Sequence, residues 1–271
     1  VDNPCPRINE NRTVKTDHLI CPAKLTLSLS VEGRRSDGYH LIDAEMVSVD
    51  LCDEMFIKDG SKLTVLSSDS GFDIPTDRNN LVTRALDLVH RSADVVIHKR
   101  IPAGAGLGGG SSNAAAVLRW ASFNDPIAAS ALGADIGFCL NGGRARVQGI
   151  GEKLRPLPFL EREMTLLIPP FGISTKEVYR VWDELGGPQG DHGNDLEPAA
   201  LVVAPELSDW RDALTKATGK QARLAGSGGT WFVEGRHEEF VHCGVGSISV
   251  KTLPQNSALE KTQRTNRPSQ N

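Results

Sequence analysis

Alternating apolar and polar residues mark several strands along the chain. In the segment "LTLSLSVEG" at 25–33, most apolar side chains fall at every second position, which is the pattern of a half-buried strand. Further strand-like segments occupy 41–60, 61–68, 94–102, 164–170 and 222–235, the last as a strand, a turn and a second strand. The polar loop "GRRSDGYH" at 33–40 separates the first two strands.

Helical patterns lie between these strands. Helices are predicted at 77–93, 111–123, 174–185 and 205–219. Asp77 or Asn79 is expected to cap the first of these, and Ser174 or Thr175 the third. Strands and helices mix without strict βαβ alternation, so the pattern predicts an α+β protein in two halves.

Two prolines near residue 158 indicate where the halves divide. Residues 1–18 are polar and predict a flexible N-terminal extension, and residues 19–158 form the first expected domain. The second expected domain covers 159–250, and the polar stretch 251–271 is expected to be disordered.

Charge and cysteine content narrow the class of protein. With 30 basic and 34 acidic residues, the formal net charge is -4, and no nucleic-acid partner is expected. No apolar run approaches the length of a membrane span, so no membrane partner is expected either. The 5 cysteines are far apart and lack CxxC spacing, which indicates reduced thiols and a cytoplasmic protein.

The stretch "GAGLGGG" at 104–110 is the strongest chemical signal in the sequence, and it has several interpretations. It could be a flexible linker, although its place between a strand and an alanine-rich helix argues against slack. Gly104, Gly106 and Gly109 fit the dinucleotide pattern G-x-G-x-x-G, with Asp125 near the distance of a ribose contact.

A third interpretation is a cradle for a nucleoside triphosphate. Successive glycines expose backbone N–H groups, and the following helix offers the positive end of its dipole. Ser111 and Ser112 add hydroxyls that could reach phosphate or Mg²⁺. No lysine follows the last glycine as in a Walker A loop, so a cation for the transferred phosphate must come from elsewhere.

These motifs, taken in order, resemble those of the GHMP kinase family. The family's second motif, P-x-x-x-G-L-G-S/G-S/G-S-S, is matched from Pro102 to Ser112, and "PAKLTLSL", "GRRSDGYH", "NDLEPAA" and "LAGSGGTWF" match further motifs. The resemblance covers roughly residues 20 to 240. It implies a first half like ribosomal protein S5 domain 2, a ferredoxin-like second half, and ATP with Mg²⁺ as cofactors.

The resemblance also assigns residues. Lys24 and Asp135 match the family's catalytic pair, with Asp135 orienting the attacking hydroxyl and Lys24 stabilising charge. Taken alone, Lys24 could be a solvated strand-end lysine and Asp135 a helix cap. The residues implied in ATP binding are Pro102, Gly104, Gly106, Leu107, Gly108, Gly109, Gly110, Ser111, Ser112, Gly226, Ser227 and Gly228. Ser112 is a candidate Mg²⁺ ligand.

The loop at 33–40 resembles the corresponding loop in one branch of the family. That branch acts on a cytidine diphosphate-linked methylerythritol in isoprenoid precursor synthesis. That branch implies that Tyr39, His40 and Tyr179 hold the cytosine. The resemblance implies that Thr26 is a further substrate-binding residue. Thr26 stands where the family usually has Asn, which puts substrate identity or rate in question. A GHMP kinase for another small alcohol, or a nucleotide-binding homologue without turnover, are the alternatives. A monomer or a homodimer is expected.

Overall fold

The computed structural model describes residues 15–67, 74–255 and, for the backbone alone, 263–265. Its strands in the first half are β1 (Thr16–Arg34), β2 (His40–Lys58), β3 (Leu63–Ser67), β4 (Asp94–Lys99), β5 (Arg144–Gly149) and β6 (Lys153–Pro156). The later strands are β7 (Glu163–Leu167), β8 (Arg223–Leu224), β9 (Trp231–Glu234), β10 (Val241–His242), β11 (Val245–Gly246), β12 (Ile248–Leu253) and β13 (Gln263–Thr265). The helices are α1 (Leu81–Leu88), α2 (Gly109–Trp120), α3 (Pro126–Ser130), α4 (Ile136–Asn141), α5 (Thr175–Glu184), α6 (Glu197–Val203) and α7 (Leu207–Thr218).

Strand β2 is the hub of one large, mainly antiparallel sheet. It pairs with β1 along nearly its whole length, with β5 at 42–47 and with β4 at 54–58. Strand β12 pairs with β2 at Val49 and Ser48 and with β7 beyond them, so it joins the two halves of the chain. The α+β class predicted from the sequence is confirmed. Among the described strands, β3 and β4 pair in parallel at one side of the sheet, with α1 between them in the chain, and the other strand pairs are antiparallel.

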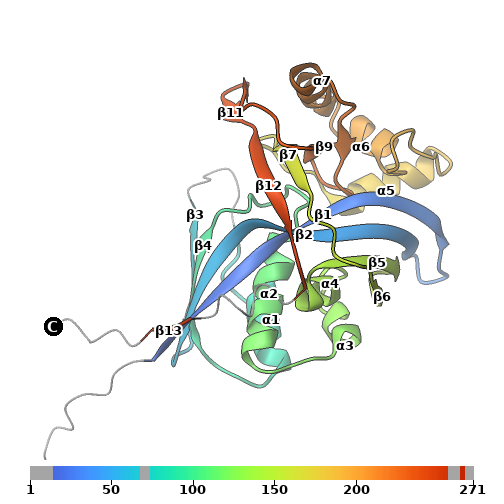
Figure 1. The fold of residues 1–271 in the computed structure, drawn as a ribbon. Helices are drawn as coiled ribbons and strands as arrows, with labels where there is room; N and C mark the ends of the chain where they lie inside the picture. The colour runs from blue at the N-terminus through green and yellow to red at the C-terminus, as the bar shows by residue number, and fades with distance from the viewer. Residues whose placement is uncertain (1–14, 68–73, 256–262, 266–271) are drawn as a thin grey trace, which may run out of the picture.

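The helices form two groups on this sheet. In Figure 1, α1 to α4 pack below the long β1–β2 hairpin, whereas α5 to α7 lie at the far end beside β7 and β9. No helix in the described part of the chain is both long and apolar enough to cross a membrane.

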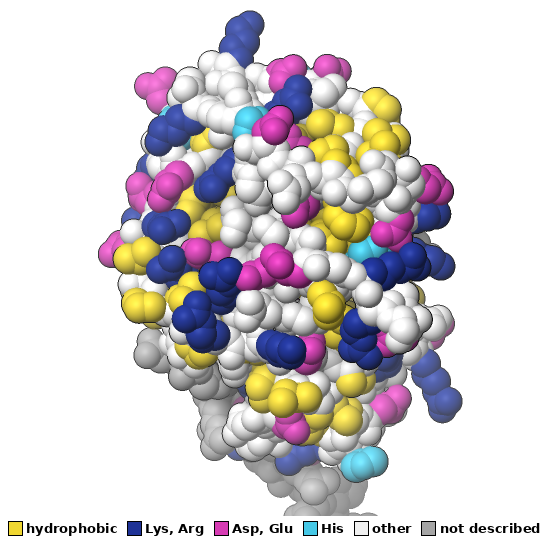
Figure 2. Space-filling model, turned by 90° about the vertical axis from the view of Figure 1, so that its right-hand side faces the viewer, with side chains coloured by type: hydrophobic (Ala, Val, Ile, Leu, Met, Phe, Trp, Pro, Cys, Tyr) yellow, Lys and Arg dark blue, Asp and Glu magenta, His cyan; other side chains and the backbone are white. Residues whose placement is uncertain are grey.

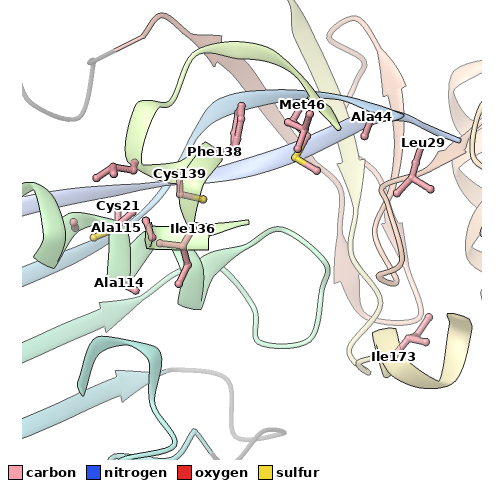
Figure 3. Packing of buried hydrophobic residues seen from close by; sticks show 14 of the residues in the cluster. Cys21, Leu29, Ala44, Met46, Ala114, Ala115, Ile136, Phe138, Cys139 and Ile173 are labelled. Atoms are coloured by element: carbon pink, nitrogen blue, oxygen red, sulfur yellow. The ribbon is translucent and has the colours of Figure 1, made fainter. Parts of the chain in front are cut away.

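Two clusters of buried apolar side chains hold these layers. The larger cluster lies between the sheet and the helices, and Figure 3 shows Cys139 of α4 on the side of Cys21 and Ala115. The smaller cluster joins Leu25 on β1 to Leu166 and Phe232 in the second half. Because Ile101 before the glycine run and Leu107 within it belong to this smaller cluster, the run is anchored in the core.

Several element boundaries differ from the sequence predictions. The side chain of Asn80, not Asp77 or Asn79, caps α1 by accepting from the backbone N–H of Val82. Ser174 caps α5, as one of the two predicted alternatives.

The ends of the chain need correction too. Residues 16–18, assigned to the flexible extension, belong to β1, and residues 251–253, predicted to be disordered, complete β12. Residues 1–14 of the extension and most of the remaining tail lie outside the described residues. The division into domains at residue 158 stays a prediction, since the chain passes there from β6 to β7 of a continuous sheet.

Charges of both signs are mixed over the visible surface. On the face shown in Figure 2, basic and acidic side chains alternate without forming one large field of a single sign. Ion pairs account for part of this mixing, such as Arg144 with Glu45 at 2.8 Å and Arg34 with Asp183 at 3.3 Å.

The buried thiols of Cys21 and Cys139 should resist alkylation in the folded protein. Burial raises the pKa of each thiol to about 12, so almost no thiolate is present at pH 8. Cys243 is exposed and should react. Iodoacetamide labelling at pH 8 followed by peptide mass spectrometry should modify Cys243 first, and all three after denaturation. Labelling of Cys139 as fast as Cys243 in the native protein would contradict the packing.

Candidate active site

The glycine run forms the wall of a pocket between β4 and α2. The pocket has a volume of about 290 Å³. Of the residues predicted to bind ATP, those that line it are Pro102, Gly104, Gly106, Leu107, Gly108, Gly109, Gly110 and Ser111. Helix α2 begins at Gly109, and Gly108 precedes it in the left-handed conformation with φ of 67° and no side-chain cap. The first N–H groups of α2 therefore have no competing side-chain acceptor, as an anion site at a helix N-terminus requires.

The second small-residue loop, Gly226 to Gly228, packs directly on the first. A Cβ on Gly106 would lie 2.6 Å from the Cα of Gly228, and one on Gly228 would lie 2.3 Å from the Cα of Gly106. Thr230 strengthens the contact by donating from its hydroxyl to the carbonyl of Ala105 at 2.7 Å. Glycine is required on both sides because no side chain fits between the two backbones.

Asn194 fixes the second loop from behind. Its side-chain amide donates to the carbonyls of Leu224 at 2.9 Å and Gly226 at 2.7 Å, and its Oδ1 accepts from the N–H of Leu196. Asn194 is buried, so these bonds are shielded from water. The motif "NDLEPAA" therefore supports the glycine loops in this structure.

Lys24 and Asp135 meet beside these loops, although 111 positions separate them in the sequence (135 minus 24). The Lys24 ammonium lies 3.5 Å from Oδ2 of Asp135 and 3.1 Å from Oγ1 of Thr26. The side chain of Lys24 is only 7% exposed, whereas that of Asp135 is 32% exposed. The Asp135 carboxylate can therefore contact the hydroxyl of a molecule that enters from solvent, while the Lys24 ammonium stays buried beneath it.

The structure also argues against the simpler alternatives for Lys24 and Asp135. Lys24 is buried on β1, so it is not a solvated strand-end lysine. Asp135 occupies the N-cap position of α4, yet its side chain makes no capping hydrogen bond. The carboxylate is thus left for the ion pair with Lys24.

His40 and Tyr179 form an aromatic pair near Asp135. Their ring centroids are 4.7 Å apart and the rings are stacked at 23°. Nε2 of His40 lies 2.8 Å from Oδ1 of Asp183, which fixes the imidazole. Burial, and then the charge of Asp135, raise the pKa of the Tyr179 hydroxyl, so Tyr179 stays a neutral stacking surface close to the ion pair.

Tyr39 stands apart from this pair. Its side chain is among the exposed large hydrophobic groups, with 61% of its surface accessible, and it makes no ring contact in the described part of the structure. Ser227 is half-buried and shares a hydrogen bond of 2.9 Å with the hydroxyl of Thr175. The structure therefore brings together His40 and Tyr179, but not all three residues predicted to hold a cytosine.

A buried charge network beneath the glycine run was missed by the sequence analysis. Asp53 is fully buried and accepts hydrogen bonds from the ammonium of Lys99, the side-chain amide of Asn113 and the backbone N–H groups of Arg100 and Ile101. It thus ties β2 to the start of the glycine run and to α2. No local pattern marks Asp53, because an acidic residue within a strand usually faces solvent.

Arg119 supports α4, the helix that follows Asp135, from its C-terminal end. Its guanidinium is buried and donates to the carbonyl of Cys139 at 2.6 Å, in the last turn of α4. A cation is favourable at a helix C-terminus. Arg119 therefore helps to hold the short helix that begins next to Asp135.

Asp125, which the dinucleotide pattern would use for a ribose contact, caps a helix in this structure. Its carboxylate accepts from the backbone N–H groups of Ile127 and Ala128 at the start of α3. This engagement of Asp125 argues against the dinucleotide interpretation of the glycine run.

Two glycine loops are in contact in this α+β fold, and a lysine–aspartate pair lies beside them. This combination defines a small-molecule kinase of the GHMP class. Residues 80–143 match the model of the GHMP kinases N terminal domain. A solved 4-(cytidine 5'-diphospho)-2C-methyl-D-erythritol kinase superposes with a TM-score of 0.65 at 31% identity, over 81% of this chain and 90% of that chain.

Curated relatives narrow the class. The chain is 37% identical over 230 residues to the 4-diphosphocytidyl-2-C-methyl-D-erythritol kinase of Paracoccus denitrificans, covering 78% of this chain and 84% of the relative. It is 35% identical over 246 residues to the enzyme of the same name from Pelotomaculum thermopropionicum, covering 78% and 86%. The chain belongs to the 4-diphosphocytidyl-2-C-methyl-D-erythritol kinase family.

Replacing Gly106 by Ala should weaken ATP binding and lower stability. The new Cβ would force the two glycine loops apart, in addition to the cost of a left-handed alanine, which is about 1 kcal/mol. Gly186→Ala is a matched control, because Gly186 has φ of +79° against +78° at Gly106 and no atom within 4 Å of its Cβ position. Thermal unfolding and the KM for ATP should change clearly more in Gly106→Ala. Equal effects in the two variants would show that the loop contact is unimportant.

Proposed function

We propose that this protein is an ATP-dependent kinase that phosphorylates the 2-hydroxyl of 4-diphosphocytidyl-2-C-methyl-D-erythritol, in the non-mevalonate route to isoprenoid precursors. The observation that carries the proposal is the ion pair of Lys24 and Asp135, in which Lys24 lies against Gly108 of the pocket wall and Asp135 is near enough to Tyr179 to act on its pKa. The names of its relatives supply the substrate, and the arrangement of the site supports it.

The geometry gives each group a part in phosphoryl transfer. The triphosphate of ATP would lie along the glycine run and the N-terminus of α2, where backbone N–H groups stabilise its charge. The hydroxyl oxygen of the alcohol attacks the terminal phosphorus, its proton passes to the carboxylate of Asp135, and ADP leaves. The ammonium of Lys24 stabilises the charge on the transferred phosphoryl group.

Ser112 is the residue that best fits a Mg²⁺ ion. Its hydroxyl is buried in the first turn of α2 and has no hydrogen-bond partner within the described residues, which is unusual for a buried polar atom. A bound Mg²⁺ would neutralise phosphate charge. Ser112 would offer its Oγ as one ligand, and the phosphates would provide others.

The cytosine would be held at the His40–Tyr179 stack. An aromatic face binds a pyrimidine by stacking, and Tyr39 is free to turn toward the base from the loop between β1 and β2. The remaining features of the protein follow the same proposal: a cytoplasmic enzyme acting on a small molecule, as a monomer or a homodimer.

Substrate identity is tested by ADP release with three alcohols. Coupled assays with 4-diphosphocytidyl-2-C-methyl-D-erythritol, mevalonate and homoserine should give turnover with the first alone. Turnover with another alcohol would identify a different GHMP kinase. ATP binding without turnover on any of them would point to a non-catalytic homologue.

Asp135→Asn should nearly abolish turnover without unfolding the protein. An amide cannot take the proton of the hydroxyl, and loss of such a group typically costs about 10²- to 10⁴-fold in rate. The kcat should fall by that order while the melting temperature stays close to wild type, since the side chain caps no helix. Glu184→Gln, an exposed change on α5, is the control. Retained activity in Asp135→Asn would refute the role.

Tyr179→Ala should raise the KM for the cytidine substrate, and Tyr179→Phe should not. Stacking of a base on an aromatic ring contributes about 1–3 kcal/mol, or roughly tenfold to hundredfold in affinity. The KM for ATP should be unaffected in both variants. An equal rise in the KM for the cytidine substrate in Tyr179→Phe would instead assign the effect to the hydroxyl.

A further inference from the structure

Thr26 is placed against the ammonium of Lys24, not against the open part of the site. Both residues lie on β1, two positions apart, so their side chains emerge on the same face of the strand. The hydroxyl of Thr26 accepts from Nζ of Lys24 at 3.1 Å. Only 1% of Thr26 is exposed to solvent, whereas a third of the Asp135 side chain is exposed.

The surroundings of Thr26 leave no direct path to a substrate. A Cβ built on Gly226 would lie 3.2 Å from Oγ1 of Thr26 and 3.7 Å from Nζ of Lys24, so the second glycine loop covers both groups. The carbonyl of Gly226 is in turn held by Asn194. The hydroxyl therefore sits in a fixed slot beneath the loop.

The rest of the Lys24 side chain is held along its length. A Cβ on Gly108 would meet the Cγ of Lys24 at 2.6 Å, and the backbone N–H of Lys24 donates to the carbonyl of Leu107 at 2.9 Å. Only the ammonium retains freedom to turn, and it has two anchors: Oγ1 of Thr26 and Oδ2 of Asp135. The β-branched side chain of Thr26 has few rotamers, which makes its oxygen a well-fixed anchor.

We propose that Thr26 is a positioning residue for Lys24, in contrast to the substrate-binding role that the family resemblance implied for it. This inference rests on the proposed kinase function. The Thr26 hydroxyl holds the Lys24 ammonium at 3.5 Å from Oδ2 of Asp135. Without this anchor the ammonium would swing onto the carboxylate and form a closer ion pair. The carboxylate would then be a weaker acceptor for the proton of the hydroxyl, and the cation would move away from the phosphoryl group. The family's usual Asn at this position is thus replaced by a different polar anchor for the lysine.

The test compares Thr26→Val with Thr26→Ser. Valine keeps the shape of threonine and removes the hydroxyl, whereas serine keeps the hydroxyl. The loss of a hydrogen bond to a charged group predicts a decrease of about tenfold to hundredfold in kcat for Thr26→Val. Both KM values should stay within about twofold of wild type. Thr26→Ser should retain the wild-type kcat within about threefold.

Thr165→Val is a matched control for the loss of a buried threonine hydroxyl. Thr165 is also a strand residue with 1% exposure, and its hydroxyl donates to the carbonyl of Gly235 at 2.9 Å, in the second half of the chain. Its kcat should remain that of wild type, whatever the change in melting temperature. If Thr26→Val does not fold, Thr26→Ala is compared with Thr26→Ser by the same criteria.

A double-mutant cycle with Lys24→Ala isolates the coupling. Thr26→Val should reduce kcat further by less than about twofold once Lys24 has been removed, because its effect acts through the ammonium. An additive effect would overturn the proposal. So would a higher KM for the alcohol at unchanged kcat, which would make Thr26 a substrate-binding residue, or an unchanged kcat and KM.

Failure of this inference can be told from failure of the proposed function. If wild type phosphorylates none of the three alcohols, the proposed function fails, and the variants are compared by their slow hydrolysis of ATP with Mg²⁺ alone. Hydrolysis that falls in Thr26→Val and is retained in Thr26→Ser supports the positioning role. Equal hydrolysis in both variants and wild type overturns it.

Discussion

The contact between Gly106 and Gly228 is the constraint on which the rest of the site depends. It joins a loop from the first half of the chain to a loop from the second, with no room for a Cβ on either side. Lys24 runs beneath the first loop and its ammonium ends beside Gly226 of the second. The distance between the Lys24–Asp135 pair and the glycine pocket is therefore set by two backbones rather than by flexible side chains.

The sheet makes that contact rigid. Strand β12 pairs with β7 and then with β2, so the second half of the chain returns to the hub strand of the first. Beneath the pocket, Asp53 on β2 satisfies two backbone N–H groups at the start of the glycine run. Burying a carboxylate is costly, and the cost is offset here because it also meets Lys99 and Asn113. The result is a pocket whose glycine wall is fixed from both sides.

Local features were predictable from the sequence, and contacts between distant segments were not. The strand, glycine run and helix at 94–120 follow from period and composition, and they appear as β4 and α2. The pairing of Lys24 with Asp135 came only from the family resemblance, because nothing within either segment points to the other. Asp53 and Arg119 were not predicted, because a single charged residue within an apolar segment forms no periodic pattern in the sequence. The strand at 251–253 was missed because its partners, β7 and β2, lie far away in the chain.

The burial of Lys24 explains why its neighbours matter more than its own charge. A solvated lysine samples many rotamers, and fixing it costs up to about 2 kcal/mol of side-chain entropy. Here the glycine loops exclude water and the aliphatic chain lies against Gly108, so most of that cost belongs to folding and not to the reaction. What remains to be set is the direction of the ammonium between Asp135 and Thr26. A preorganised charge stabilises a transition state without reorganising when the reaction occurs, and in this site the preorganisation comes from backbone contact below and a hydroxyl beside the cation.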